Sequence, residues 1–210
     1  MKTFKLHLIR HGLTQGNLDG VYVGGGLDIP LCQPGIEQLQ TLARQYRYPQ
    51  VPVLFSSPMR RALQTAEILY PEMPERFVLE DLRENVFGPF EGRRVAELVE
   101  DEDFKRWMDP ASDVVPEGAE SGKAFSARTA RALGTMLRYL IDNGIGAAVC
   151  VTHGGVIMSM LSQLALPRKP YPEWMADNGC GFTVQTSTAM LMRDGLVEVM
   201  GVVPPDYRSN

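Results

Sequence analysis

The sequence predicts an α/β fold: a three-layer α/β/α sandwich around a mostly parallel sheet with an antiparallel edge. Short apolar segments typical of buried strands alternate with longer segments in which apolar residues recur at helical spacing. Strands that alternate with helices form parallel sheets that are covered on both faces. Near the C-terminus, Arg193–Gly195 is typical of a hairpin turn between Ala189–Leu191 and Leu196–Val202, and this pattern predicts the antiparallel edge.

The first half of the chain predicts strands and helices in alternation. Pro34 and Gly35 open the first helix, in which apolar residues recur at helical spacing as far as Tyr46. Ser57 follows the second strand and is a good N-cap for the next helix, with Pro58 at the first helical position. The predicted strands of this half are Lys2–Ile9, Val53–Phe55 and Phe77–Leu79.

The second half contains a segment of different character. From about residue 85 to 120 the sequence is polar and contains several glycine, proline and acidic residues, with a short polar helix predicted over about 95–108. We interpret this segment as an insertion within a single domain that spans residues 1–210. Beyond the insertion, the predicted elements are a long helix over about 121–142, a strand over 147–151 and an apolar helix over 156–166.

Composition argues against several classes of function. The chain has 210 residues, of which 44% are hydrophobic, and this is enough for a full core. The formal net charge of −4 comes without a basic tail or an arginine-rich stripe, so nucleic acid is not an expected partner. No apolar segment approaches the roughly 18 residues of a membrane span, and none is typical of a secretory leader. We therefore expect a cytoplasmic protein with no membrane partner, either a monomer or a homodimer.

Cysteine and histidine usage predicts neither a disulfide framework nor a metal site. The three cysteines are scattered, which fits a reducing compartment. The histidines are His7, His11 and His153, and no group of His, Cys or carboxylate residues has the spacing of metal ligands. His7 lies within the first strand and is interpreted as structural. We expect no metal and no other cofactor.

Polar side chains follow four of the predicted strands. His11, Ser57 with Arg61, Glu84 and His153 each come after a different strand. Ligands of mainly parallel sheets bind beyond the carboxyl ends of the strands. We therefore expect these side chains to lie together at one edge of the sheet.

The sequence Arg10-His11-Gly12 indicates phosphate chemistry at this edge. Arginine presents a rigid fork of donors that matches phosphate oxygens, and glycine lets the backbone approach a ligand closely. A neutral imidazole nitrogen is nucleophilic near pH 7. We expect the other ring nitrogen of His11 to donate its proton to a backbone carbonyl, such as that of the following glycine, so that the attacking nitrogen stays unprotonated.

Five motifs occur along the chain in the order found in the histidine phosphatase superfamily, and together they resemble that superfamily, which includes the cofactor-dependent phosphoglycerate mutases. The resemblance runs from Arg10 to Gly155 and implies a single histidine phosphatase domain with a phosphoglycerate mutase-like sandwich. It also implies that the insertion at about 85–120 lies near the mouth of the active site. The motifs are Leu8–Gly12, Ser57–Ala62, Leu82–Glu84, Phe87–Gly92 and Val151–Gly155.

The resemblance implies a metal-independent phosphatase that acts through a phosphohistidine on His11. Glu84 would donate a proton to the leaving oxygen and then activate water against the phosphohistidine. His153 would be protonated and would stabilise the charge of the transferring group. The expected partner is a small phosphorylated substrate.

Four groups are expected to bind the phosphoryl oxygens. Arg10 and Arg61 would supply positive charge, and Asn17 and the backbone amide of Gly154 would add neutral donors. The family pattern Arg-Ala-x-Gln-Thr-Ala fits residues 61–66, so it selects Arg61 and leaves Arg60 as a solvated helix residue.

Two alternatives stay open: mutase-type phosphoryl transfer, and a non-catalytic phosphoryl-ligand or protein-interaction module. The mutases carry a longer insertion with an Arg-Arg-Ser-x-Asp-x-Pro-Pro-Pro type segment that has no counterpart here. Residues 110–120 are acidic, with Asp113, Glu117 and Glu120, and would repel a doubly phosphorylated cofactor. The loop Gly24–Leu31 resembles that of small phosphatases, including those that act on alpha-ribazole 5'-phosphate, although its glycine triplet departs from the usual pattern. The natural substrate and pathway stay open.

Overall fold

The computed structural model describes residues 2–72, 75–109 and 112–208. Its strands are β1 (Thr3–Arg10), β2 (Val53–Ser56), β3 (Glu75–Val78), β4 (Ala147–Thr152), β5 (Ala165–Leu166), β6 (Gly181–Ser187) and β7 (Val197–Val203). They form one sheet in the order β3-β2-β4-β1-β6-β7-β5. β3, β2, β4 and β1 are parallel neighbours, whereas β6 runs antiparallel to both β1 and β7.

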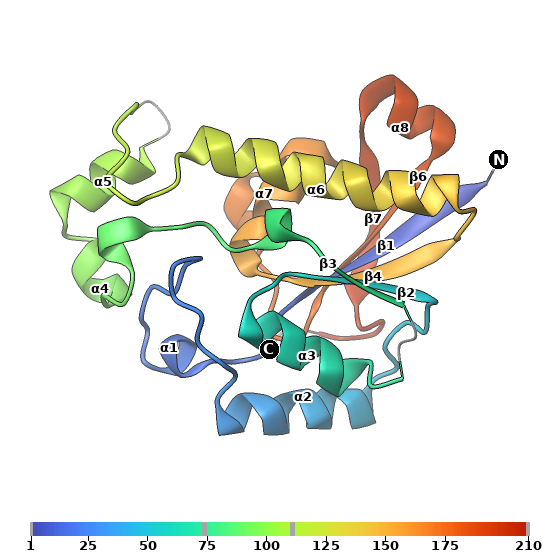
Figure 1. Cartoon of the computed structure of the whole chain (residues 1–210), viewed down its shortest axis with the longest axis horizontal. Helices are drawn as coiled ribbons and strands as arrows, with labels where there is room; N and C mark the ends of the chain where they lie inside the picture. The colour runs from blue at the N-terminus through green and yellow to red at the C-terminus, as the bar shows by residue number, and fades with distance from the viewer. Residues whose placement is uncertain (1, 73–74, 110–111, 209–210) are drawn as a thin grey trace.

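Helices cover both faces of this sheet and complete three layers, as Figure 1 shows. α2 (Gln33–Gln45) and α3 (Arg60–Leu69) lie on one face, and α6 (Gly122–Asp142) and α7 (Gly154–Leu164) lie on the other. The predicted α/β sandwich is therefore confirmed. The short elements are α1 (Gln15–Leu18), α4 (Val95–Leu98), α5 (Glu102–Met108), α8 (Thr188–Asp194), η1 (Glu80–Leu82), η2 (Gly88–Phe90) and η3 (Tyr171–Trp174). Within the described residues, no helix is long and apolar enough to cross a membrane.

The core consists of one large hydrophobic cluster on each face of the sheet. Phe4, Leu6 and Leu8 of β1 pack with α6 and α7, whereas Ile9 packs with α2 and α3. This division follows from the alternation of side chains along a strand. Because β1 is packed on both sides, the residues at its carboxyl end, where Arg10 and His11 lie, are held in place.

The C-terminal segment differs from the predicted hairpin. Residues 188–194 form α8, which the Ser187 hydroxyl caps by accepting a hydrogen bond from the Met190 amide at 3.2 Å. Gly195 ends the helix with a φ of 66°. A glycine after Arg-Asp fits a helix C-cap as well as a hairpin turn, so the local pattern was ambiguous. The strand that pairs with β7 is β6, whose largely polar sequence Gly-Phe-Thr-Val-Gln-Thr-Ser did not predict a strand.

Two helix starts also differ from expectation. Met59, rather than Ser57, is the N-cap of α3, and its side chain makes no capping hydrogen bond. The single helix predicted over 95–108 is two helices, α4 and α5. They separate at Asp101, whose carboxylate accepts hydrogen bonds from the first turn of α5.

Candidate active site

The carboxyl ends of the parallel strands bring the predicted polar groups together. Arg10 ends β1 and His11 follows it, Arg61 lies in the first turn of α3 after β2, and His153 follows β4. Glu84 lies beyond η1 and accepts a hydrogen bond from the Gly155 amide at 3.0 Å. The expected convergence at one sheet edge is therefore present in the structure. We call Arg10, His11, Arg61, Glu84 and His153 the floor of the site.

His11 is held as a neutral imidazole with one free nitrogen. Its Nδ1 lies 2.7 Å from the Gly12 carbonyl oxygen, and because a carbonyl only accepts, Nδ1 carries the proton. This is the hydrogen bond that the sequence predicts. Burial, followed by the charges of Arg61 and Arg10, holds the pKa of His11 well below 6.5. Its Nε2 therefore keeps a lone pair at neutral pH.

His153 differs from expectation in its protonation state. Burial, followed by the charge of Arg61, lowers the pKa of His153 well below 6.5, so in the free site it is neutral rather than protonated. Its Nε2 lies 2.7 Å from Ser57 Oγ, and its buried Nδ1 has no hydrogen-bond partner among the described residues. The ring lies edge-on to that of His11, with 5.1 Å between the centroids. An anion bound beside both rings would favour protonation of His153.

Burial shifts Glu84 toward its protonated form. It is 8% exposed, and burial raises its pKa, against the opposing effects of two backbone amides and two arginines. One carboxylate oxygen accepts from the Asn85 amide at 2.8 Å and the other from the Gly155 amide at 3.0 Å. A Cβ added at Gly155 would lie 2.4 Å from Glu84 Oε1, so glycine is required there for the carboxylate to keep this place.

The structure separates the two neighbouring arginines. Arg61 is 1% exposed, and its guanidinium donates to the carbonyl oxygens of Leu27 at 3.0 Å and Gly24 at 3.2 Å. The side chain of Arg60 is exposed. Arg10 donates to the Ala176 carbonyl at 2.8 Å, while its buried Nε has no partner among the described residues. Arg61 and Arg10 therefore provide buried positive charge on the floor, and Arg60 does not.

The two expected neutral donors differ in their availability. Asn17 forms a capping box with Thr14, whose amide and hydroxyl both donate to Asn17 Oδ1 at 3.0 Å. Its oxygen is engaged, so a phosphate contact would have to use its Nδ2. Gly154 begins α7, and a Cβ added there would lie 3.4 Å from Arg10 Nε. The Gly154 backbone is therefore next to the free edge of the Arg10 guanidinium.

The glycine triplet 24–26 packs closely against the segment that carries Glu84. A Cβ at Gly24 would lie 2.5 Å from the Asn85 carbonyl oxygen, and a Cβ at Gly25 would lie 2.4 Å from that of Glu84. The Gly25 amide donates to the Asn85 carbonyl at 2.8 Å. Close packing, in addition to the turn, thus explains these glycines.

Arg128 is a site residue that the sequence did not predict. From α6 it donates to the backbone carbonyls of Asp81, Arg83 and Glu84, and it makes a two-pronged ion pair with Glu120 in which both distances are 2.7 Å. It therefore holds the chain on either side of Glu84. An arginine on a long amphipathic helix gives no sequence signal that separates it from a solvated residue.

Beside the floor lies the segment that the sequence interprets as an insertion, which we call the insertion wall (described residues 85–109 and 112–120). It contains η2, α4 and α5 and has its own small core of Phe90, Leu98 and Phe104. Trp107 stacks on Phe90 with 5.5 Å between the ring centroids. In Figure 1, α4 and α5 lie beyond the end of the sheet where β1 and β4 end.

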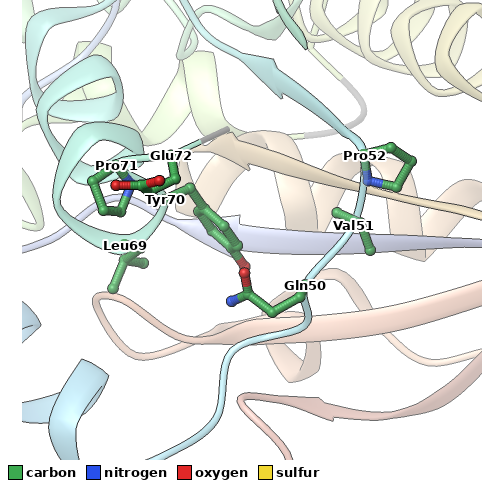
Figure 2. A pocket seen from close by; sticks show the side chains of 7 residues that line it. All are labelled: Gln50, Val51, Pro52, Leu69, Tyr70, Pro71 and Glu72. Carbon is green, nitrogen blue, oxygen red and sulfur yellow. The ribbon is translucent and has the colours of Figure 1, made fainter. Parts of the chain in front are cut away.

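A separate hollow lies at the opposite end of β2 and contains none of the floor residues. It has a volume of about 560 Å³ and is formed by residues just before β2 and just after α3. Figure 2 shows the side chain of Tyr70 pointing toward Gln50 there. No cluster of three or more His, Cys, Asp or Glu side chains that could hold a metal ion is found among the described residues.

Comparison with known proteins places this arrangement in a family. The chain is 29% identical over 181 residues to an adenosylcobalamin/alpha-ribazole phosphatase of Escherichia coli, covering 84% of this chain and 87% of that protein. The crystal structure of the alpha-ribazole phosphatase from Shigella flexneri superposes with a TM-score of 0.77 at 25% identity, over 94% of this chain and 95% of that one. A phosphoglycerate mutase structure from Bacillus anthracis, at 21% identity and a TM-score of 0.72 over 95% and 92% of the two chains, shares the fold.

The family profile decides the assignment. The profile of the histidine phosphatase superfamily (branch 1) matches residues 6–188, which include every residue of the floor. The predicted enzyme class, a phosphoric monoester hydrolase, is confirmed by this match together with the phosphatase relatives. This chain belongs to the histidine phosphatase superfamily, branch 1, on its phosphatase side.

Proposed function

We propose that this protein is a metal-independent phosphatase that hydrolyses a small phosphomonoester through a phosphohistidine on His11. The observation that carries the proposal is the 2.7 Å hydrogen bond from His11 Nδ1 to the Gly12 carbonyl. It leaves Nε2 as the nucleophilic nitrogen, in a site where burial, followed by the charges of Arg61 and Arg10, lowers the pKa of the ring.

The substrate's phosphoryl group would bind between groups that lack partners in the free site. Arg10 Nε and His153 Nδ1 are both buried and without a hydrogen-bond partner among the described residues. Buried polar atoms in native structures are normally satisfied, so the unpartnered Arg10 Nε–H, a donor, favours a bound anion, and His153 Nδ1 becomes a second donor once the ring is protonated. The charge of Arg61 would add to the attraction. A phosphate dianion would in turn raise the pKa of His153, which gives it the charge that the chemistry needs.

In the first step, His11 Nε2 would attack phosphorus, and the bond from phosphorus to the ester oxygen would break. Glu84 would give its proton to the departing oxygen, which leaves as an alcohol. The raised pKa of Glu84 supports this role, because more of the carboxyl is protonated near neutral pH than for a solvated glutamate.

In the second step, Glu84 is a carboxylate and would take a proton from water. The oxygen of that water would attack phosphorus as the bond to His11 Nε2 breaks. Inorganic phosphate and neutral His11 result, with Glu84 protonated again for the next turnover. The backbone amides of Asn85 and Gly155 would keep the carboxylate in one orientation through both steps.

Mutase-type transfer has weaker support than hydrolysis. A mutase must bind a second anionic group, whereas the described wall carries the carboxylates of Asp113 and Glu117. Glu120, the third acidic residue predicted to repel such a group, is already engaged by Arg128. The resemblance to the phosphoglycerate mutase structure is a resemblance of fold.

Trapping of the intermediate tests the proposal. The protein would be mixed with 4-nitrophenyl phosphate in a chelator, quenched in alkali, in which phosphohistidine is stable, and digested for mass spectrometry. We expect one phosphoryl group on the peptide that contains His11, and none in His11→Asn. Turnover without any phosphorylated peptide would contradict a covalent route, and loss of turnover in the chelator would contradict metal independence.

A further inference from the structure

A large cavity lies between the insertion wall and the helices α6 and α7. Its volume is about 630 Å³, within the usual range for small-molecule sites. Trp107 and Met108 contribute from the end of α5, Phe125 from α6 and Ser159 from α7. This cavity is distinct from the hollow at the other end of β2.

Three hydrogen bonds connect residues that line the cavity to Glu84. Asn85 and Tyr171 both line it. The Asn85 amide donates to one oxygen of the Glu84 carboxylate at 2.8 Å. The Tyr171 hydroxyl donates to the carbonyl of Gly155 at 3.3 Å, and the amide of Gly155 donates to the other oxygen of that carboxylate. The cavity therefore lies next to the backbone groups that hold Glu84, the residue that would protonate the leaving oxygen.

The cavity gathers apolar side chains that are exposed to solvent. Met108, Val114, Val115 and Tyr171 line it, with exposed fractions of 49%, 52%, 43% and 41%. Large apolar side chains scattered singly on a surface are ordinary, but several around one concave site mark a place where a ligand covers them. An apolar body would be stabilised here.

The charges of the cavity oppose those of the floor. Asp109 and Asp113 line it, and Lys123 is the one cationic side chain among its described lining residues. Asn85 lines the cavity, and its Oδ1 is buried without a hydrogen-bond partner among the described residues. A carboxylate or second phosphate would meet net repulsion here, whereas a neutral or cationic group would not.

We propose that this cavity holds the leaving-group half of the substrate and selects phosphate esters of neutral or cationic alcohols with an apolar body over esters that carry a second anionic group. This inference rests on the proposed function. It adds the class of alcohol that the phosphatase accepts, and it assigns the selection to Asp113 and the apolar lining of the wall.

A matched series of benzyl phosphates tests the selection. The 4-methyl, 4-aminomethyl and 4-carboxy esters have similar size and differ in charge. We expect kcat/KM for the methyl and aminomethyl esters to exceed that for the carboxy ester by about tenfold or more. Equal values, or a preference for the carboxy ester, would overturn the inference while leaving the phosphatase intact.

A charge reversal locates the selection in the cavity. Asp113→Lys is an exposed substitution and should reduce the preference against the carboxy ester by about tenfold. Glu72→Lys makes the same change of charge in the hollow at the other end of β2 and should leave the preference unchanged. An equal effect of both variants would overturn the assignment to the cavity.

Failure of the proposed function would give a different result. In that case no member of the series, nor 4-nitrophenyl phosphate, would release phosphate, and both proposals would fall together. Release from all esters without selection by charge overturns only the inference about the cavity.

Discussion

The floor and the insertion wall are held in different ways. Floor side chains are anchored to backbone groups of the sheet edge, as in the hydrogen bonds of His11 to Gly12 and of Glu84 to Gly155. The wall has short helices and a small buried cluster of three residues, Phe90, Leu98 and Phe104. Segments with few buried apolar contacts open at low free energy. The difference teaches that a firmly anchored site can adjoin a segment that opens at low free energy.

The strongest test of the comparison is removal of the nucleophile. His11→Ala should lower kcat by about 10⁴-fold or more for every ester, because no other floor group has a free nucleophilic nitrogen aligned by a backbone carbonyl. Phosphate release from an activated and an alkyl ester measures this. A residual rate above a few per cent on either ester would break the comparison, since the chemistry would then not depend on the floor.

The next effect separates two adjacent arginines. Arg61→Ala should reduce kcat/KM by roughly 10²- to 10³-fold and weaken binding of vanadate, because a buried charge beside the phosphoryl group is lost. Arg60→Ala is the matched control, and with its exposed side chain it should stay within about threefold of the original. Thermal unfolding of both variants checks that the fold is retained. A larger loss of kcat/KM in Arg60→Ala than in Arg61→Ala would mean that the phosphoryl group binds outside the floor.

Replacement of the acid should depend on the leaving group. Glu84→Gln should slow alkyl phosphates by about 10²-fold or more and activated aryl phosphates far less, since only the former need a proton on the leaving oxygen.

The pH profile of kcat/KM for the alkyl ester follows from the protonation of Glu84 and His11. As pH rises through the raised pKa of Glu84, its proton is lost and the rate falls. On the acid side His11 stays neutral until pH is well below 6.5, so the rate persists there. In Glu84→Gln the alkaline decline should vanish, and its survival would remove Glu84 as the acid.

A smaller effect tests how tightly the floor fits. Gly155→Ala would place a methyl group 2.4 Å from Glu84 Oε1 and should move the carboxylate, lowering kcat for alkyl esters by about tenfold. Gly146→Ala has no heavy atom within 4 Å of the added Cβ and serves as the control. Unchanged kcat in Gly155→Ala would show that the floor tolerates displacement of the Glu84 carboxylate. The floor would then be no less tolerant of change than we expect the wall to be.

The smallest effect on chemistry is expected in the wall. Phe104→Ala removes an aromatic ring that packs on Phe90 with 5.2 Å between centroids, and it should reduce hydrogen-exchange protection across α4 and α5. We expect kcat for 4-nitrophenyl phosphate to change by less than about threefold, while KM for benzyl esters rises by about tenfold. An equal loss of kcat on both substrates would contradict this expectation and would show that the wall also supports catalysis.

The sequence predicted the floor better than its supports. Polar residues after apolar strand segments, in a parallel sheet, have to meet at one edge, so the convergence of His11, Glu84 and His153 followed from a general rule. The tautomer of His11 could be predicted because its partner, Gly12, is adjacent in the chain. The ionisation of His153 could not, because it depends on burial and on distant arginines. Arg128 reaches Glu84 across 44 residues, and no periodicity records such a contact.

Two elements of the fold were predicted wrongly from the sequence, the N-cap at Ser57 and the hairpin near the C-terminus. Ser57 has the residue type of an N-cap, yet its hydroxyl lies against His153, which is 96 positions away in the chain. α8 was mistaken for a hairpin because Gly195 serves either structure in the local sequence. The Ser57 contact lies far outside any short window of sequence, whereas α8 is set by local capping at Ser187 and Gly195, which the local pattern did not separate from a hairpin.

The glycines around Glu84 determine where this enzyme can be changed by laboratory evolution. Gly25 and Gly155 leave no room for a β-carbon against the backbone and the carboxylate of Glu84, and Gly24 leaves none against the carbonyl of the next residue, Asn85. A library that randomises these positions would consist mainly of inactive clones, whatever ester is used for selection. Randomising exposed wall positions, such as Met108, Val114 and Val115, leaves the catalytic groups untouched. A search for new ester preferences is therefore best confined to the wall, where many sequences remain compatible with turnover.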